Sequence, residues 1–247
     1  MLAGGIIPTE AQASSLPWGD NAKAKNGTVA IGDNSTAMAD NSVALGTGAT
    51  VTETNRAGVG NVQGVAIGRN ATVEVNNGVA IGNLTKVASL NGFALGNTSW
   101  AGYDEAGKYV GADNDQAFGT NARAWGGSSM AFGNNAKASK GGAVAMGNGS
   151  QSRGDWGVAI GNGAKALAAG ARAIGANSTA DATNAAAMGW DSAASGEASI
   201  AIGETAKATK NNSIAMSKAA IAAADDSIAI GKNALVDTNQ QRSIALG

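Results

Sequence analysis

The chain repeats one short hydrophobic pattern along most of its length. A large apolar residue, an alanine, a second large apolar residue and a glycine follow one another, first as Val29-Ala30-Ile31-Gly32 and last as Ile244-Ala245-Leu246-Gly247. The pattern returns every 14 residues, with eight consecutive steps of 14 between Ala117 and Ala229. A fixed short period is typical of a solenoid, in which each repeat buries its apolar face by stacking on its neighbours. The sequence therefore predicts one elongated all-β unit.

The apolar pair of each repeat predicts a short β-strand, because side chains two residues apart lie on the same face of a strand. We expect pairs such as Val43 and Leu45 to fill the interior of the coil and the alanine between them to face outward. An outward position that is always small suggests that another chain packs closely there. The alternative is that alanine only keeps a flat outer sheet from being sticky. The expected chain-packing positions are Ala30, Ala44, Ala66, Ala80, Ala94, Ala117, Ala131, Ala145, Ala159, Ala173, Ala187, Ala201, Ala215, Ala229 and Ala245.

A second short strand is predicted after each glycine. The third and fifth residues after the glycine are small, as Ala136 and Ala138 are after Gly133, and we expect them to share the interior face. The residue between them varies, as Thr36 and Lys137 show, so we expect it to point to solvent. Glycine followed by asparagine is typical of the turn that joins the two strands. Each repeat is thus one coil of a parallel β-roll, stacked at about 4.8 Å per coil.

Three breaks in the period predict insertions, near residues 52–63, 102–114 and 237–242. All three fall in the connection that follows the second strand, so they are expected to leave the roll along one edge. Connections that depart from a regular scaffold often carry binding residues.

The insertion at 102–114 is the strongest candidate for ligand recognition. It holds both tyrosines of the chain and predicts a small hairpin with a glycine in its turn. Clustered tyrosine and tryptophan with charged residues at the rim are typical of recognition surfaces. The alternative is that the hairpin caps its own aromatic side chains onto the roll or onto an adjacent chain. The candidate residues are Trp100, Tyr103, Asp104, Glu105, Lys108 and Tyr109.

Composition narrows the function further. The 247 residues include no histidine and no cysteine, so the commonest general base and thiol chemistry are missing, and we expect no enzyme, cofactor or metal site. A net charge of -1 gives no drive toward nucleic acid. No stretch approaches the roughly 20 apolar residues of a spanning helix, so we expect no direct membrane insertion of this chain.

The first 17 residues predict a tail ahead of the roll, which occupies 18–247. An apolar piece before residue 13 ends in Ala11-Gln12-Ala13, which fits the end of a secretory signal with its cleavage site. A plain N-terminal tail is the alternative.

The repeats resemble the heads of trimeric autotransporter adhesins, the YadA-like heads. Asn41-Ser42-Val43-Ala44-Leu45-Gly46 and Asp226-Ser227-Ile228-Ala229-Ile230-Gly231 carry the resemblance, which covers about residues 18–247. It implies a left-handed parallel β-roll that assembles as a homotrimer, in which the alanine positions would form the trimer packing.

The resemblance also implies display outside the cell, on the Gram-negative outer membrane, and attachment to an extracellular matrix protein or to a host-cell or bacterial surface receptor. The stalk and anchor of that family are not recognisable here, so the chain resembles an isolated head. A structural spacer that displays another binding domain is the alternative function. The ligand stays open, as does the choice between the insertion and the repeated outward side chains as its site.

Overall fold

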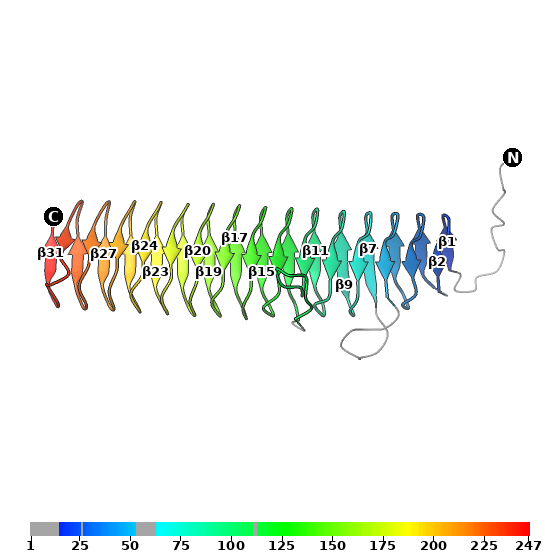
Figure 1. Cartoon of the computed structure of the whole chain (residues 1–247), viewed down its shortest axis with the longest axis horizontal. Coiled ribbons are helices and arrows are strands. Elements are labelled where there is room, and N and C mark those ends of the chain that lie inside the picture. The colour runs from blue at the N-terminus through cyan, green and yellow to red at the C-terminus, as the bar shows by residue number, and fades with distance from the viewer. Residues whose placement is uncertain (1–14, 26, 53–62, 111–112) are drawn as a thin grey trace.

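The protein is an elongated rod of stacked coils in the computed structural model, which describes residues 15–25, 27–52, 63–110 and 113–247 (Figure 1). The expected signal-peptide remnant and nearly all of the insertion near 52–63 lie outside these residues. Within them, each coil except the last contributes one strand to a sheet of sixteen and one to a sheet of fifteen; the last coil contributes only to the first of these, and all neighbouring strands in each sheet are parallel. The described residues form no helix, so none of them belongs to a helix able to cross a membrane.

The two sheets alternate along the chain. The first sheet consists of β1 (Leu16–Trp18), β3 (Val29–Ile31), β5 (Val43–Leu45), β7 (Gly64–Ile67), β9 (Gly78–Ile81), β11 (Phe93–Leu95), β13 (Gln116–Phe118), β15 (Met130–Phe132), β17 (Val144–Met146), β19 (Val158–Ile160), β21 (Arg172–Ile174), β23 (Ala186–Met188), β25 (Ile200–Ile202), β27 (Ile214–Met216), β29 (Ile228–Ile230) and β31 (Ile244–Leu246).

The second sheet is made of two-residue strands. These are β2 (Lys23–Ala24), β4 (Thr36–Ala37), β6 (Thr50–Val51), β8 (Thr72–Val73), β10 (Lys86–Val87), β12 (Trp100–Ala101), β14 (Arg123–Ala124), β16 (Lys137–Ala138), β18 (Gln151–Ser152), β20 (Lys165–Ala166), β22 (Thr179–Ala180), β24 (Ala193–Ala194), β26 (Lys207–Ala208), β28 (Ile221–Ala222) and β30 (Leu235–Val236).

Corresponding residues of successive coils stack directly on one another. Ala159 of β19 pairs with Ala173 of β21, which pairs with Ala187 of β23. The same register holds across the longer connections, since Phe93 of β11 pairs with Gln116 of β13. The three longer connections follow β6, β12 and β30, all at the end of a second-sheet strand. Each ladder of the rod is therefore one sequence position repeated, as the 14-residue period predicts.

The first strand is turned the opposite way to our prediction. The alanine of each repeat points into the roll and is fully covered by its own chain, while the large residues beside it face outward; Phe132, for example, is 52% exposed next to Ala131 at 0%. The prediction that these alanines pack against another chain is therefore wrong for Ala30, Ala44, Ala66, Ala80, Ala94, Ala117, Ala131, Ala145, Ala159, Ala173, Ala187, Ala201, Ala215 and Ala229. Ala245, in the last coil, is only half-buried.

The narrow interior explains this orientation. Short turns hold the two sheets close together, and the space between them takes alanine, serine, threonine and valine, with Val51, Val73 and Val87 among the largest fully buried side chains. The prediction for the second strand is confirmed, because Ala136 and Ala138 are fully buried. A signal for the first strand was present in the residue two before each alanine, which shares its face and is almost always small.

Glycine is strongly favoured where the first strand turns into the second, although Ser217 takes this position in one coil with φ 106°. Gly161 has φ 134°, and a Cβ placed on it would lie 2.5 Å from the carbonyl oxygen of Gly175 in the next coil. At the opposite edge of the rod, asparagines take the left-handed conformation and stack through their side chains. Asn77 Nδ2 donates to Asn91 Oδ1 (2.9 Å), and Asn91 Nδ2 donates to Asn114 Oδ1 (3.1 Å).

Candidate functional site

The outer face of the first sheet is an apolar surface that runs along the rod. We call it the apolar face, and it comprises the side chains before and after the alanine in each strand from β3 to β31. The residue after the alanine is large and apolar in all of these strands. In several strands it is exposed while the residue before the alanine is half-buried, as Leu95 (41%), Phe132 (52%) and Ile230 (42%) show. Folding of one chain thus leaves a row of large apolar side chains in contact with water.

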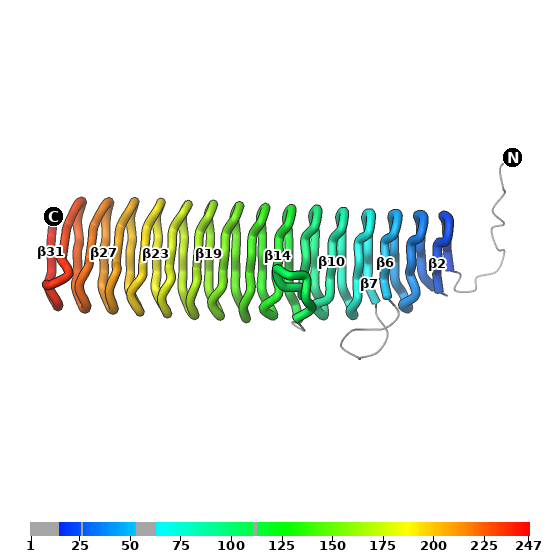
Figure 2. Tube along the Cα trace, viewed as in Figure 1, coloured from blue at the N-terminus to red at the C-terminus, as the bar shows by residue number. Residues whose placement is uncertain are grey.

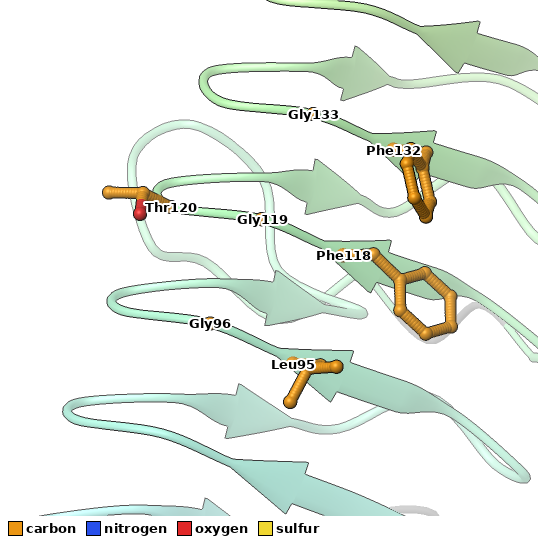
Figure 3. Close-up of a pocket in the computed structure, with 7 residues that line it drawn as sticks. All are labelled: Leu95, Gly96, Phe118, Gly119, Thr120, Phe132 and Gly133. Carbon is orange, nitrogen blue, oxygen red and sulfur yellow. The ribbon is translucent and has the colours of Figure 1, made fainter.

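A shallow hollow lies on the apolar face where phenylalanines gather (Figure 3). The Phe93 and Phe118 rings stack at 5.1 Å between centroids, and the Phe118 and Phe132 rings are 5.8 Å apart. The hollow measures about 360 Å³ and is lined by Leu95, Gly96, Phe118, Gly119, Thr120, Phe132 and Gly133. Its lining offers a hydroxyl and backbone groups but no ionisable side chain, so the hollow suits apolar packing rather than acid–base chemistry.

Two polar side chains interrupt the apolar face. Gln116 and Arg172 both precede the alanine of their strands, whereas the column after the alanine has no polar member. Arg172 stays in register with Val158 and Ala186, so it does not distort the coil, and its Nη1 donates to the carbonyl oxygen of Gly170 at 3.3 Å. The guanidinium therefore bends toward the edge of the apolar face.

The insertion after β12 forms the expected small hairpin. Tyr103 and Tyr109 form an antiparallel bridge, and Gly107 in the turn has φ 78°. The Asp104 carboxylate accepts hydrogen bonds from the backbone N–H groups of Ala106 (3.0 Å) and Lys108 (2.8 Å). The Asp104 side chain thus stabilises the turn of the hairpin.

The hairpin projects from the rod near β14 (Figure 2) and folds back onto it, so that Gly107 in its turn lies against the Trp100 ring and Arg123 contacts Asp104. The Arg123 guanidinium lies 3.9 Å from the centroid of the Trp100 ring, and the Lys86 ammonium lies 5.0 Å from it. The Tyr103 ring meets Trp100 edge-on at 6.0 Å. Tyr103 itself is only 4% exposed, and its hydroxyl donates to Glu74 Oε2 at 2.7 Å. Both aromatic side chains are therefore committed to contacts within the chain.

Charged contacts fasten the hairpin across several coils. Arg123 Nη1 donates to the carbonyl oxygens of Asp104 and Glu105, both at 3.1 Å. Burial lowers the pKa of Arg123, and the charges of Glu105 and Asp104 oppose that shift. The Glu105 carboxylate lies 3.2 Å from Lys137 Nζ and 4.0 Å from the Arg153 guanidinium. The tip of the hairpin thus reaches the coil that contains Arg153.

The structure brings the six candidate residues together but divides them into two groups. Trp100, Tyr103 and Asp104 hold the hairpin on the roll, which matches the alternative that the hairpin caps its own aromatics. Glu105 and Lys108 are exposed and Tyr109 is half-buried. A recognition role for these three residues stays a prediction.

The carboxyl group of Asp115 lies inside the roll, where the insertion rejoins the coil. Asp115 Oδ1 accepts hydrogen bonds from the N–H groups of Gly127 (2.9 Å) and Ser129 (3.1 Å) and from the Ser129 hydroxyl (2.7 Å). Burial raises the pKa of Asp115, and these hydrogen bonds oppose the shift. No group of histidine, cysteine, aspartate and glutamate suited to a metal ion occurs among the residues that the structure describes.

Comparisons with known proteins agree with this architecture. The family model YadA head domain repeat matches more than half of the chain, at residues 24–49, 61–85, 113–136, 126–150, 138–164, 166–192, 194–216 and 218–234.

The chain is similar to the solved collagen-binding domain of the Yersinia adhesin YadA, with 21% identity and a TM-score of 0.22. The match covers 74% of this chain and 65% of that one, so it spans less than two thirds of the solved chain. No curated protein matches. The repeats along the rod show that the chain belongs to the family of YadA head domain repeats.

Proposed function

We propose that this chain is the head of a cell-surface adhesin and that three copies pack together through the apolar face. The observation that carries the proposal is the row of exposed large apolar side chains along the first sheet. Exposed apolar surface of this extent on a soluble protein marks a contact with another protein, because leaving it in water is unfavourable. A second and a third copy of the same face would cover it along the whole rod.

The two columns of the apolar face suggest how the copies meet. We place the column after the alanine closest to the threefold axis, because it has no polar member and leaves the larger side chains exposed. We place the column before the alanine toward the rim, where Gln116 and Arg172 can keep contact with water. This arrangement replaces the alanine-mediated packing that the sequence suggested.

The partners proposed for the head are an extracellular matrix protein or a receptor on a host cell or another bacterium, met outside the cell at the surface of a Gram-negative outer membrane. Membership of the YadA head repeat family supports this role. Collagen is the first ligand to test, since the Yersinia domain is described as collagen-binding. A role in binding rather than catalysis fits membership of this family of adhesin head repeats.

A mass measurement in solution tests the assembly. Light scattering on the purified chain should give three times the 24.0 kDa mass of one chain at micromolar concentration. A folded monomer under these conditions would contradict the trimer and leave the apolar face without its proposed partner.

The second candidate function is a structural spacer that displays another binding domain. It is favoured by the hairpin, whose aromatic residues are engaged in contacts within the chain. Replacing residues 102–114 with the four-residue turn Ser139–Gly142 preserves the register, because that turn joins the corresponding strands of a regular coil. If the hairpin recognises the ligand, this variant stays trimeric and loses attachment to immobilised collagen and cell surfaces. Unchanged attachment of the variant would exclude the hairpin as the ligand-binding site. An unmodified trimer that attaches to none of these surfaces would favour the spacer.

A further inference from the structure

An exposed tryptophan interrupts the asparagine ladder along the edge of the rod where the second strand turns back. After Asn114, the same position holds Ser128, Gly142, Trp156 and Gly170 in successive coils, and asparagine returns at residue 184. Trp156 is 74% exposed, so the chain gains little burial from it. The tip of the hairpin reaches the same coil, because Glu105 lies 4.0 Å from Arg153, three residues before Trp156.

The backbone at this position is poorly suited to tryptophan. Trp156 has φ 57°, a conformation that asparagine and glycine adopt easily and that costs a bulky residue about 1 kcal/mol. A residue kept in an unfavourable conformation without compensating burial points to a role outside folding.

Glycines on either side make the ring of Trp156 a flat platform. A Cβ on Gly142 would clash with the six-membered part of the ring, so the ring rests directly on the backbone of that coil. Gly170 in the following coil has no side chain to cover the ring from the other side. One face of the indole is thus supported and the ring is open to solvent. The C–H groups on the face of a sugar ring carry partial positive charge and pack well against such an electron-rich surface.

Two exposed cations belong to the same pair of adjacent turns as this platform. The Arg153 side chain is 51% exposed, and Lys140, two residues before Gly142, is also exposed. The nearest acid in sequence, Asp155, accepts a hydrogen bond from the backbone N–H of Gly141 at 3.0 Å and so stabilises the turn. An anionic group on a bound sugar would find partners in Arg153 and Lys140, as guanidinium and ammonium groups both pair with carboxylate and sulfate.

We propose that Trp156, Arg153 and Lys140 form a binding site for acidic glycans, in which a pyranose ring stacks on Trp156 and its carboxylate or sulfate pairs with the two cations. This ligand class deepens the proposed adhesive function and rests on it, although the site itself lies within a single chain.

The test compares Trp156→Asn with the unmodified protein. Asparagine occupies this position in other coils and suits its φ, so the variant should melt at the same temperature or higher. Binding of a heparin-derived oligosaccharide and of a hyaluronan fragment, measured by surface plasmon resonance, should weaken at least about tenfold. The two probes separate sulfate from carboxylate recognition. Trp190→Ala removes a tryptophan that is 52% exposed at the opposite edge and should leave binding unchanged.

Two further variants test the charges. Arg153→Gln should weaken binding several-fold, and Glu105→Gln should strengthen it, because the neighbouring carboxylate no longer competes for Arg153. Maltohexaose, which is uncharged, should bind at least tenfold more weakly than the heparin oligosaccharide. Polyglutamate binding should not change in Trp156→Asn, since a peptide has no sugar ring to stack.

Several results would overturn the site: no binding of either acidic oligosaccharide, equal binding by Trp156→Asn, equal binding of maltohexaose, or an equal loss of polyglutamate binding. A monomeric chain that binds the acidic glycans would contradict the trimer and support the site. A trimeric chain that binds neither would leave the assembly intact and overturn the site.

Discussion

The two sheets of the rod enclose the same interior and differ on their outer faces. The first sheet presents large apolar side chains in nearly every strand, whereas the second presents a changing series that includes Thr50, Arg123 and Lys207. Because small buried residues support both sheets alike, the stacking of coils does not dictate the outward side chains. Their nature therefore reflects what each face meets, protein for the first sheet under our proposal and mainly water for the second.

A charge placed on each face tests this contrast most strongly. Ile202→Lys puts an ammonium group into the proposed trimer contact, where an unpaired buried charge costs about 3 kcal/mol or more. We expect the variant to become monomeric in light scattering. Thr50→Lys makes a similar change on the outer face of the second sheet and should remain trimeric. A trimer that survives Ile202→Lys would contradict the proposed role of the apolar face.

Enlarging an alanine in the interior and another on the outer face of the second sheet tests how narrow the space between the two sheets is. Ala201→Leu forces a large side chain between the two sheets and should lower the free energy of unfolding by about 3 kcal/mol. Ala193→Leu, on the outer face of the second sheet, should change it by less than about 0.5 kcal/mol. Denaturant unfolding at one fixed protein concentration measures both, and similar effects would show that the interior is wider than the structure indicates.

The turn glycine links the two sheets, and its replacement should have a smaller effect. Gly161→Ala introduces a Cβ 2.5 Å from the next coil at φ 134°, which should cost about 2 kcal/mol of stability. Gly149→Asn is the matched control, because Gly149 has φ 66° and open space beside it. We expect the control to be neutral or slightly stabilising in thermal melts.

The smallest expected effect concerns Asp115, whose charge lies inside the coil that carries the hairpin. Its folded-state pKa is raised above the ordinary value of 3.8, so the ionised form penalises folding above the folded pKa and the penalty fades as the pH falls toward 3.8. As the pH is lowered from 7 to 4, the unmodified protein should therefore gain stability relative to the Asp115→Asn variant. Melting temperatures of the two proteins at both pH values measure this difference, and a gap independent of pH would contradict it.

The 14-residue period was sufficient to predict the coil, its parallel stacking and the inward side of the second strand. Repetition predicts these features because each position must fit the same position of the next coil. The direction of the first strand was not predictable from alternation alone, since Val-Ala-Ile can bury either set and hydrophobicity favours the large one. The narrow width of the interior decides which set of side chains is buried. The small residues Ser42 and Ser213, which lie on the same face as the alanines, indicated that this width is small.

The hairpin was predictable as a local element but its contacts were not. Its glycine and paired tyrosines suggest a turn, whereas the partners of its aromatic residues lie far away in sequence. Glu74 is 29 residues from Tyr103, and Arg123 is 19 residues from Asp104. The buried Asp115 likewise depends on Ser129, which stacks beside it only after the coils have formed.

The unbroken register across the insertions has a consequence for how such rods change in length. Because β11 and β13 pair as any other neighbours do, a segment can be added at that connection without shifting the coils on either side. Whole repeats can be gained or lost in the same way, each changing the reach of the rod by about 4.8 Å. The length of the rod and the segments inserted between its coils can therefore vary independently in evolution, and each can be altered separately by design.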